Sequence, residues 1–199
     1  MTLILVLAGF LGPHPGWAGD ANTLFSTTAG TGPSISTIGN EHVLNLGKAE
    51  WEAIKTYCPG FQLHKQGHYM PEVVNSYHFS ERQTLFAVIG DFNGDGKKDV
   101  VLQGYDKTSD LLIAVVSSAK GPRVIEIKKW TAIDMMKNAV IGLQREDYLT
   151  FVPKGKINSP IEKEPLRLSA DAFQLVYFEK AGTVYYLSGG KFEQYTTGD

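Results

Sequence analysis

Residues 84–116, TLFAVIGDFNGDGKKDVVLQGYDKTSDLLIAVV, decide the fold class of this chain. Apolar runs rich in β-branched residues occupy 85–89, 100–102 and 111–116, and polar or glycine-containing segments separate them. Short apolar runs bounded by turn residues are typical of strands. We interpret the segment DKTSD at 106–110 as a polar turn between two of these strands. The centre of the chain is therefore predicted to be a set of hairpins.

Working outward, the C-terminal part continues the strand pattern and the N-terminal part holds helices. Trp51, Ile54 and Cys58 fall on one helical stripe that Pro59 ends, and Pro71 opens a second short helix. Further strand-like runs follow at 124–127, 148–152, 173–178, 183–187 and 192–195. We therefore predict an α+β domain over 41–199, with one or two N-terminal helices followed by a mostly antiparallel sheet of about seven strands.

The first 40 residues are interpreted as export and tether segments. Leu3–Leu11 is an apolar run too short to span a bilayer, and Gly16-Trp17-Ala18 offers small residues around a cleavage site after Ala18. This predicts a signal peptide at 1–18 and a secreted or periplasmic mature protein without a membrane span; the alternative is a buried N-terminal strand. Residues 19–40, rich in Ser, Thr and Gly, are expected to be a flexible linker or an irregular arm laid on the domain.

Composition excludes several classes of protein. The 199 residues carry 19 Lys and Arg against 21 Asp and Glu, a net charge of -2. This balance offers no basic surplus to neutralise phosphates, so no nucleic-acid partner is expected. The single cysteine, Cys58, excludes an internal disulfide and a Cys-rich zinc site. No nucleotide-binding glycine motif, metalloprotease motif or nucleophile elbow is present in the sequence.

One segment carries specific chemistry, DFNGDGKKD at 91–99. Side-chain oxygens recur at its positions 1, 3, 5 and 9, and glycines fill positions 4 and 6. A Ca²⁺ ion takes about 6–8 oxygen ligands, and alternate residues of a coiled loop point inward, so this spacing predicts a calcium site. The alternative is a solvated Asn-Gly/Asp-Gly turn between two strands. The predicted ligands are Asp91, Asn93, Asp95, Asp99 and, through its backbone carbonyl, Lys97.

The loop with its flanks, VIGDFNGDGKKDVVLQG, resembles the calcium loops of FG-GAP and VCBS-type repeats of bacterial secreted and surface proteins. It is not an EF-hand, because position 12 is Leu102 and a strand rather than a helix follows. The resemblance implies calcium held by the five residues named above, in a loop that closes on Asp99. The family repeats this motif around a β-propeller, whereas this chain holds one copy, which favours a single calcium-clipped hairpin.

A weaker metal pattern lies between the two predicted helices. His64, His68 and Glu72 are spaced four apart and would line one face of a continuous helix, where they could bind zinc. Gly67 and Pro71 disfavour such a helix, so we interpret the histidines as surface or capping residues.

Two functions of different classes follow. The first is a secreted, non-enzymatic domain in which calcium is structural and which contacts an unknown protein or glycan. The alternative is a secreted hydrolase whose calcium site braces a cleft, with acids such as Glu126, Asp171 and Glu179 as candidates. A cleft holding two acids from separate strands would favour the hydrolase, and a shallow aromatic hollow would favour the binding module.

Overall fold

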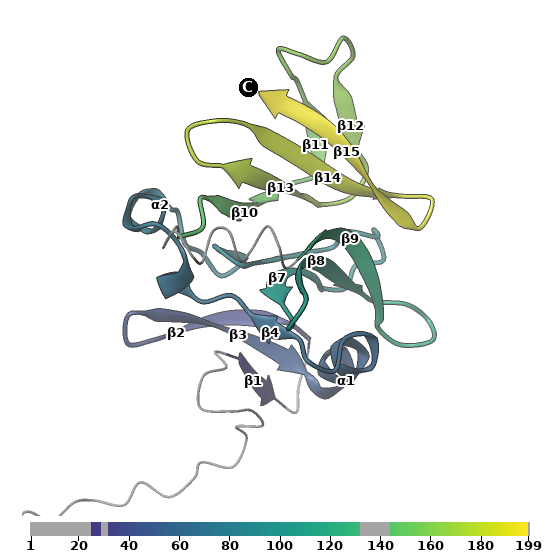
Figure 1. Ribbon diagram of the computed structural model, residues 1–199. Coiled ribbons are helices and arrows are strands. Elements are labelled where there is room, and N and C mark those ends of the chain that lie inside the picture. The colour runs from purple at the N-terminus through teal and green to yellow at the C-terminus, as the bar shows by residue number, and fades with distance from the viewer. Residues whose placement is uncertain (1–24, 29–31, 132–143, 199) are drawn as a thin grey trace, which may run out of the picture.

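Strands dominate the computed structural model, which describes residues 25–28, 32–131 and 144–198 (Figure 1). The predicted signal peptide lies outside the described residues. Within the described ranges the helical elements are α1 (Lys48–Tyr57), the 3₁₀ helix η1 (Gln66–His68) and α2 (Pro71–Ser76). Both α-helices lie where the sequence predicts them. The apolar stripe of α1 places Ile54 in the core with no exposed surface.

A small N-terminal sheet precedes α1. It has the order β1-β3-β2, with bounds β1 (Phe25–Thr28), β2 (Ser34–Ile38) and β3 (Glu41–Gly47). The pairing of β2 with β3 is antiparallel and includes Ile35 opposite Leu44, whereas β1 runs parallel to β3. Two of these strands, β1 and β2, fall inside the range 19–40 that the sequence assigns to a linker or arm.

The middle sheet contains the strands of the segment 84–116. Its bounds are β4 (Gln62–Leu63), β5 (Gln83–Thr84), β6 (Ala87–Gly90), β7 (Asp99–Tyr105), β8 (Ser109–Val116) and β9 (Arg123–Thr131). The order is β5-β6-β7-β8-β9, β4 also pairs with β7, and every pairing is antiparallel. All eight residues of β8 are buried, which explains why it reads as a continuous apolar run instead of an alternating one.

The C-terminal sheet is an antiparallel meander with the order β10-β13-β14-β15. Its bounds are β10 (Asp147–Val152), β13 (Ala172–Tyr177), β14 (Gly182–Ser188) and β15 (Lys191–Gly198), and a separate hairpin pairs β11 (Gly155–Ile157) with β12 (Leu166–Leu168). The backbone N–H of Leu149 donates to the carbonyl of Leu85 at 3.0 Å, which fastens β10 to the strand edge of the middle sheet.

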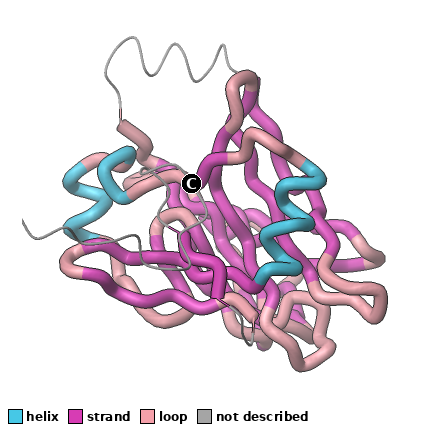
Figure 2. Tube along the Cα trace, turned by 90° about the horizontal axis from the view of Figure 1, so that it is seen from below, coloured by secondary structure: helices cyan, strands magenta, loops and turns pink. Residues whose placement is uncertain are grey.

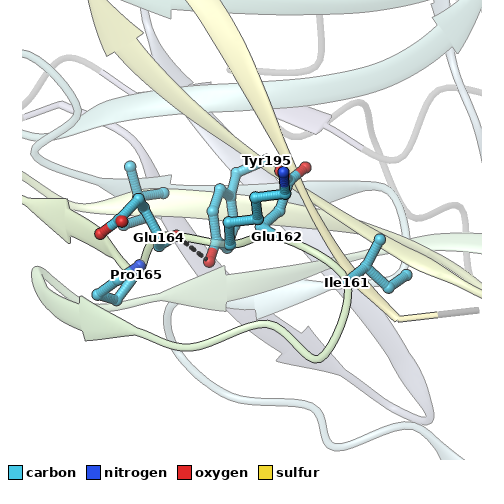
Figure 3. A pocket seen from close by; sticks show the side chains of 7 residues that line it. Ile161, Glu162, Glu164, Pro165 and Tyr195 are labelled. Carbon is cyan, nitrogen blue, oxygen red and sulfur yellow. Dashed lines mark hydrogen bonds between the residues drawn. The ribbon is translucent and has the colours of Figure 1, made fainter.

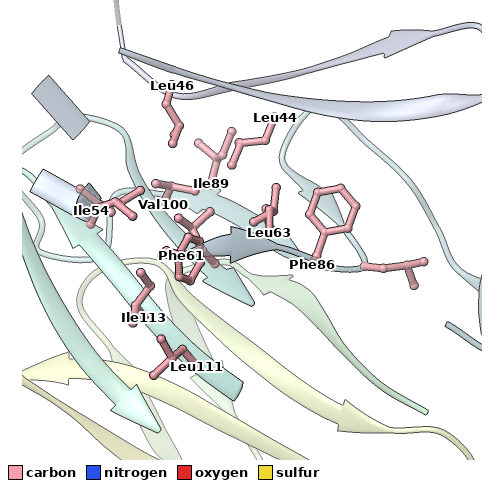
Figure 4. Packing of buried hydrophobic residues seen from close by; sticks show 14 of the residues in the cluster. Leu44, Leu46, Ile54, Phe61, Leu63, Phe86, Ile89, Val100, Leu111 and Ile113 are labelled. Atoms are coloured by element: carbon pink, nitrogen blue, oxygen red, sulfur yellow. The ribbon is translucent and has the colours of Figure 1, made fainter. Parts of the chain in front are cut away.

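The three sheets stack as layers, with the middle sheet between the other two (Figure 1). One core lies between the N-terminal layer and the middle sheet and contains Leu46, Ile54 and Ile113 (Figure 4). The second core lies between the middle and C-terminal sheets and contains Leu112 and Phe173. Successive side chains of β8 therefore enter different cores, as strand geometry requires. Helical segments lie on opposite sides of the strands (Figure 2).

The predicted fold class is wrong. The described ranges do not hold an α+β domain with one or two N-terminal helices followed by a single sheet of about seven strands; they are mostly β, and the strands belong to several sheets. Three strands also precede the first helix. The error has a physical cause: the residues of β2 are Ser-Ile-Ser-Thr-Ile, so its place comes from pairing with β3 more than from its own hydrophobicity.

Candidate metal centre

The loop singled out by the sequence joins β6 to β7. These strands pair up to Gly90 opposite Asp99, so the loop begins and ends at the last rung of a hairpin. Gly94 and Gly96 adopt φ angles of 75° and 81°. Residues that carry a side chain rarely adopt positive φ angles, so the two glycines allow the backbone to coil tightly there.

Inside the loop, side-chain oxygens accept hydrogen bonds from backbone amides. Asp91 Oδ2 accepts from the N–H of Gly96, Asn93 Oδ1 from that of Asp95, and Asp95 Oδ1 from that of Lys97, each at 2.9 Å. Short side chains that bond two residues ahead are the ordinary Asx turn. The spacing recognised in the sequence therefore wraps the backbone around the carboxylates.

Ser117, just beyond β8, ties this loop to the neighbouring strand. Its hydroxyl donates to Asp95 Oδ2 at 2.7 Å, its backbone N–H donates to Asp99 Oδ1 at 2.8 Å, and its carbonyl accepts from Asn93 Nδ2 at 2.9 Å. The hydrogen bond from Ser117 is the main cause that lowers the pKa of Asp95. Burial raises the pKa of Asp99, although backbone amides oppose it. Sequence reasoning missed Ser117 because it lies outside the motif.

Phe92 anchors the loop in the second core. Its side chain has no exposed surface, and its ring lies edge-on to Phe173 and Phe192, with centroids 6.2 and 6.3 Å away. The backbone N–H of Phe92 donates to Asp99 Oδ2 at 3.0 Å. The apolar residue at position 2 therefore fixes where the polar residues around it lie.

Asp91 has one carboxylate oxygen bonded to Gly96, while the other, Oδ1, is buried and has no hydrogen-bond donor among the described residues. Asp171 lies against the same residue, since its Oδ2 accepts from the N–H of Asp91 at 3.1 Å. A buried carboxylate oxygen without a donor is costly unless a cation or water satisfies it.

The described residues contain no ready-made group of three or more His, Cys, Asp or Glu side chains placed to hold a metal ion. The structure does bring Asp91, Asn93, Asp95 and Asp99 onto one turn, while Lys97 is exposed and its carbonyl role stays a prediction. The donor set fits a hard cation in chemistry, and its carboxylates are engaged by amides of their own loop.

A second polar cluster is buried at the other end of β7 and β8. His64 is 4% exposed, and its Nε2 lies 2.8 Å from Asp110 Oδ1. Arg145 donates to Asp110 and, at 2.5 Å, to Asp147 Oδ2. Gln103 Nε2 donates to the same oxygen of Asp147 at 2.6 Å. The ion pairs and hydrogen bonds of this cluster therefore link the middle sheet to β10.

The electrostatics of this cluster follow from burial. Burial, followed by the nearby charge of Arg145, lowers the pKa of His64 to about 4. For Asp110 burial acts to raise the pKa, but the hydrogen bond from His64 and the charge of Arg145 outweigh it and hold the pKa below its ordinary value. The interpretation of His64 as a surface or capping residue is therefore wrong. Sequence reasoning also missed Asp110, which borders a polar turn and reads as solvated.

Two of the hollows on the described surface bear on the function. One, of about 530 Å³, is lined by 161–166 and by Tyr195, whose hydroxyl donates to the carbonyl of Glu164 at 2.9 Å (Figure 3). The other, of about 220 Å³, lies beside the loop 91–99 and is lined in part by Lys97, Ser117 and Glu50. Neither is lined by Glu126, Asp171 or Glu179, the acids considered for a hydrolase.

Comparisons of the chain with protein-family models, with curated proteins and with solved structures give no match. In the part of the chain that the structure describes, no helix has both the length and the apolar character needed to cross a membrane. The site must therefore be judged from its own geometry.

Proposed function

We propose that this chain is a calcium-binding domain of a secreted or periplasmic protein, in which the ion is structural and the domain binds a protein or glycan. The observation that carries the proposal is the loop 91–99. Four oxygen-bearing side chains lie on one tight turn, and Asp91 Oδ1 is buried with no donor among the described residues. The resemblance of this loop to FG-GAP and VCBS-type loops supports the same ion.

Calcium at this loop would have a structural role: it would stabilise the link between neighbouring strands and take no part in catalysis. The loop joins β6 to β7, contacts the end of β8 through Ser117 and enters the second core through Phe92. A Ca²⁺ ion that offsets two of the three charges of Asp91, Asp95 and Asp99 would reduce the repulsion among these carboxylates and hold the three strands in register.

The expected gain follows from mass action. Extracellular calcium modules have Kd values of about 10⁻⁴–10⁻³ M. An ion at about 100 times its Kd adds about 2.7 kcal/mol to the free energy of unfolding. For a chain of this length that raises Tm by roughly 5–10 °C.

Thermal unfolding of the full-length chain in excess calcium and in excess chelator tests the proposal. We expect calcium to raise Tm in the wild type and Asp95→Ala to lose most of that rise. Asp106→Ala is a matched control, because Asp106 Oδ1 accepts from the N–H of Thr108 as Asp95 Oδ1 does from that of Lys97. Both variants remove one carboxylate and one Asx turn, but only the first should change the response to calcium. Equal Tm values with calcium and chelator in the wild type would refute the proposal.

For the partner, the hollow beside Tyr195 is the better candidate surface. It combines an aromatic ring with the carboxylates of Glu162 and Glu164 and with Ile161, which is 46% exposed. Screening the chain on a glycan array, with Tyr195→Phe as a conservative variant and Tyr195→Ala as the disruptive one, tests this surface. Loss of a glycan signal in the alanine variant alone supports it, and the same signal in all three proteins contradicts it.

A further inference from the structure

His64 and His68 face each other at the rim of the buried polar cluster. His64 follows β4, and His68 is the last residue of η1, so the two rings come from a turn rather than from one helix. Their Nδ1 atoms are 3.1 Å apart, and the rings are nearly perpendicular, at 82°. His64 is buried, while His68 is half-buried and reachable from solvent.

The partners of the two rings determine what each Nδ1 atom can donate or accept. Asp110 Oδ1 lies 2.8 Å from His64 Nε2 and Arg145 Nη1 lies 2.9 Å from it, so this nitrogen faces both an acceptor and a donor, and these contacts are compatible with either tautomer of His64. The backbone N–H of Lys65 donates to His68 Nδ1 at 3.4 Å, so that nitrogen is the acceptor of the pair. When His64 carries its proton on Nδ1, the 3.1 Å contact is a hydrogen bond to His68 Nδ1, and a divalent cation between the two nitrogens would take the place of that proton.

The separation matches the bite of a metal ion. Histidine nitrogens lie about 2.0–2.1 Å from a bound Zn²⁺ ion. Two nitrogens 3.1 Å apart at that distance subtend about 100° at the ion, between the octahedral and tetrahedral angles. Imidazole nitrogen is a preferred ligand of Zn²⁺, Ni²⁺ and Cu²⁺ and not of Ca²⁺.

The surroundings have the charge and the order that such a site needs. Asp110 and Asp147 bring two negative charges and Arg145 one positive charge, which leaves a net charge of -1 behind His64. A carboxylate on the far nitrogen of a metal-binding histidine fixes its tautomer and its orientation. Asp110 contacts the far nitrogen of His64 and is itself held by Arg145, which lies 2.9 Å from the same nitrogen.

We propose that His64 Nδ1 and His68 Nδ1 form a two-imidazole site for a divalent transition-metal ion of the Zn²⁺, Ni²⁺ and Cu²⁺ class, with Asp110 as the positioning residue and solvent or a second molecule completing the coordination. The site is separate from the calcium loop and does not rest on the proposed function. The open coordination positions next to His68 give the ion access to small ligands.

Titration calorimetry of the full-length chain with Zn²⁺, in excess calcium, tests the site. We expect one Zn²⁺ to bind per chain, His68→Gln to weaken binding at least about tenfold, and Asp110→Asn to weaken it about 10–100-fold. Because His68 is half-buried, its variant is expected to keep the fold, which circular dichroism checks. His78→Gln is the control, since His78 is exposed and should leave affinity unchanged. Asp95→Ala should also bind Zn²⁺ normally, which separates this site from the calcium loop.

A spectroscopic measurement counts the ligands directly. With one equivalent of Cu²⁺, the electron paramagnetic resonance spectrum should show two imidazole nitrogens in the wild type and one in His68→Gln. Three results would overturn the proposal: no Zn²⁺ binding by the wild type, equal affinity in the wild type and His68→Gln, or an equal loss of affinity in His78→Gln.

Discussion

Replacing Arg145 by methionine should destabilise the protein more than any exposed substitution, because the guanidinium is paired with two carboxylates that are largely shielded from solvent. The Arg145 side chain is 15% exposed, and those of Asp110 and Asp147 are 7% and 13% exposed. Breaking a buried ion pair by removing one partner costs about 3–5 kcal/mol. With about 2–4 °C per kcal/mol for a chain of this size, Tm should fall by roughly 6–20 °C. Urea unfolding followed by tryptophan fluorescence measures the loss.

A second substitution shows whether uncompensated charge is the cause. Adding Asp147→Asn to Arg145→Met removes one of the carboxylates left without a cation, and should recover at least about 1 kcal/mol. Arg123→Met is the control, because Arg123 is exposed and should change stability by less than about 0.5 kcal/mol. If Arg145→Met lies within about 1 kcal/mol of the wild type, or if the double variant is less stable than the single one, the reasoning fails.

Three further perturbations follow from the described geometry. Phe92→Ala should cost about 3–5 kcal/mol in urea unfolding, with and without calcium, because a fully buried ring is lost from the second core; a loss seen only with calcium would contradict this. Gly104→Ala should cost at least about 1–3 kcal/mol, because the added methyl group would collide with the ring of Phe61; an unchanged urea midpoint would mean that β4 moves freely. Stability should fall as pH falls from 6.5 towards about 4, by about 3 kcal/mol, since the unfolded chain takes up a proton at His64 in this window and the folded chain does not. Asp110, with its lowered pKa, adds a loss of the same sign at still lower pH. His64→Gln should flatten the profile between pH 4 and 6.5, and an equally steep profile in that variant would assign the effect elsewhere.

Local patterns predicted the centre of the fold well. The runs 100–102 and 111–116 lie within β7 and β8, and the predicted helices coincide with α1 and α2, because each has a strong apolar period and clear end signals. The N-terminal sheet could not be found in this way. Its strand β2 carries serine and threonine at three of five positions, and most of the apolar face comes from its partner β3.

The two candidate sites also differ in how far their residues could be predicted from the sequence. The candidate metal site is a local one: its five residues are proposed from their spacing within the loop 91–99, and calcium binding there stays a prediction. The polar cluster is not: His64 lies 46 residues from Asp110 and 81 from Arg145 along the chain. No short-range pattern links these positions, and a charged residue beside a turn looks solvated until a second layer covers it. Sequence reasoning therefore found the histidine pair but not the carboxylate that orients it.

The layer order also has a consequence for synthesis of the chain. The N-terminal sheet and the middle sheet leave the ribosome before β13, β14 and β15, which cover the second face of the middle sheet. Until those strands emerge, Leu112, Ala114 and Val116 present an uncovered apolar surface on the nascent chain. Folding therefore finishes late. The middle sheet can form early, but its apolar face stays exposed and prone to aggregation until the C-terminal strands have been synthesised. A chaperone that holds apolar strands would act on this protein during that interval.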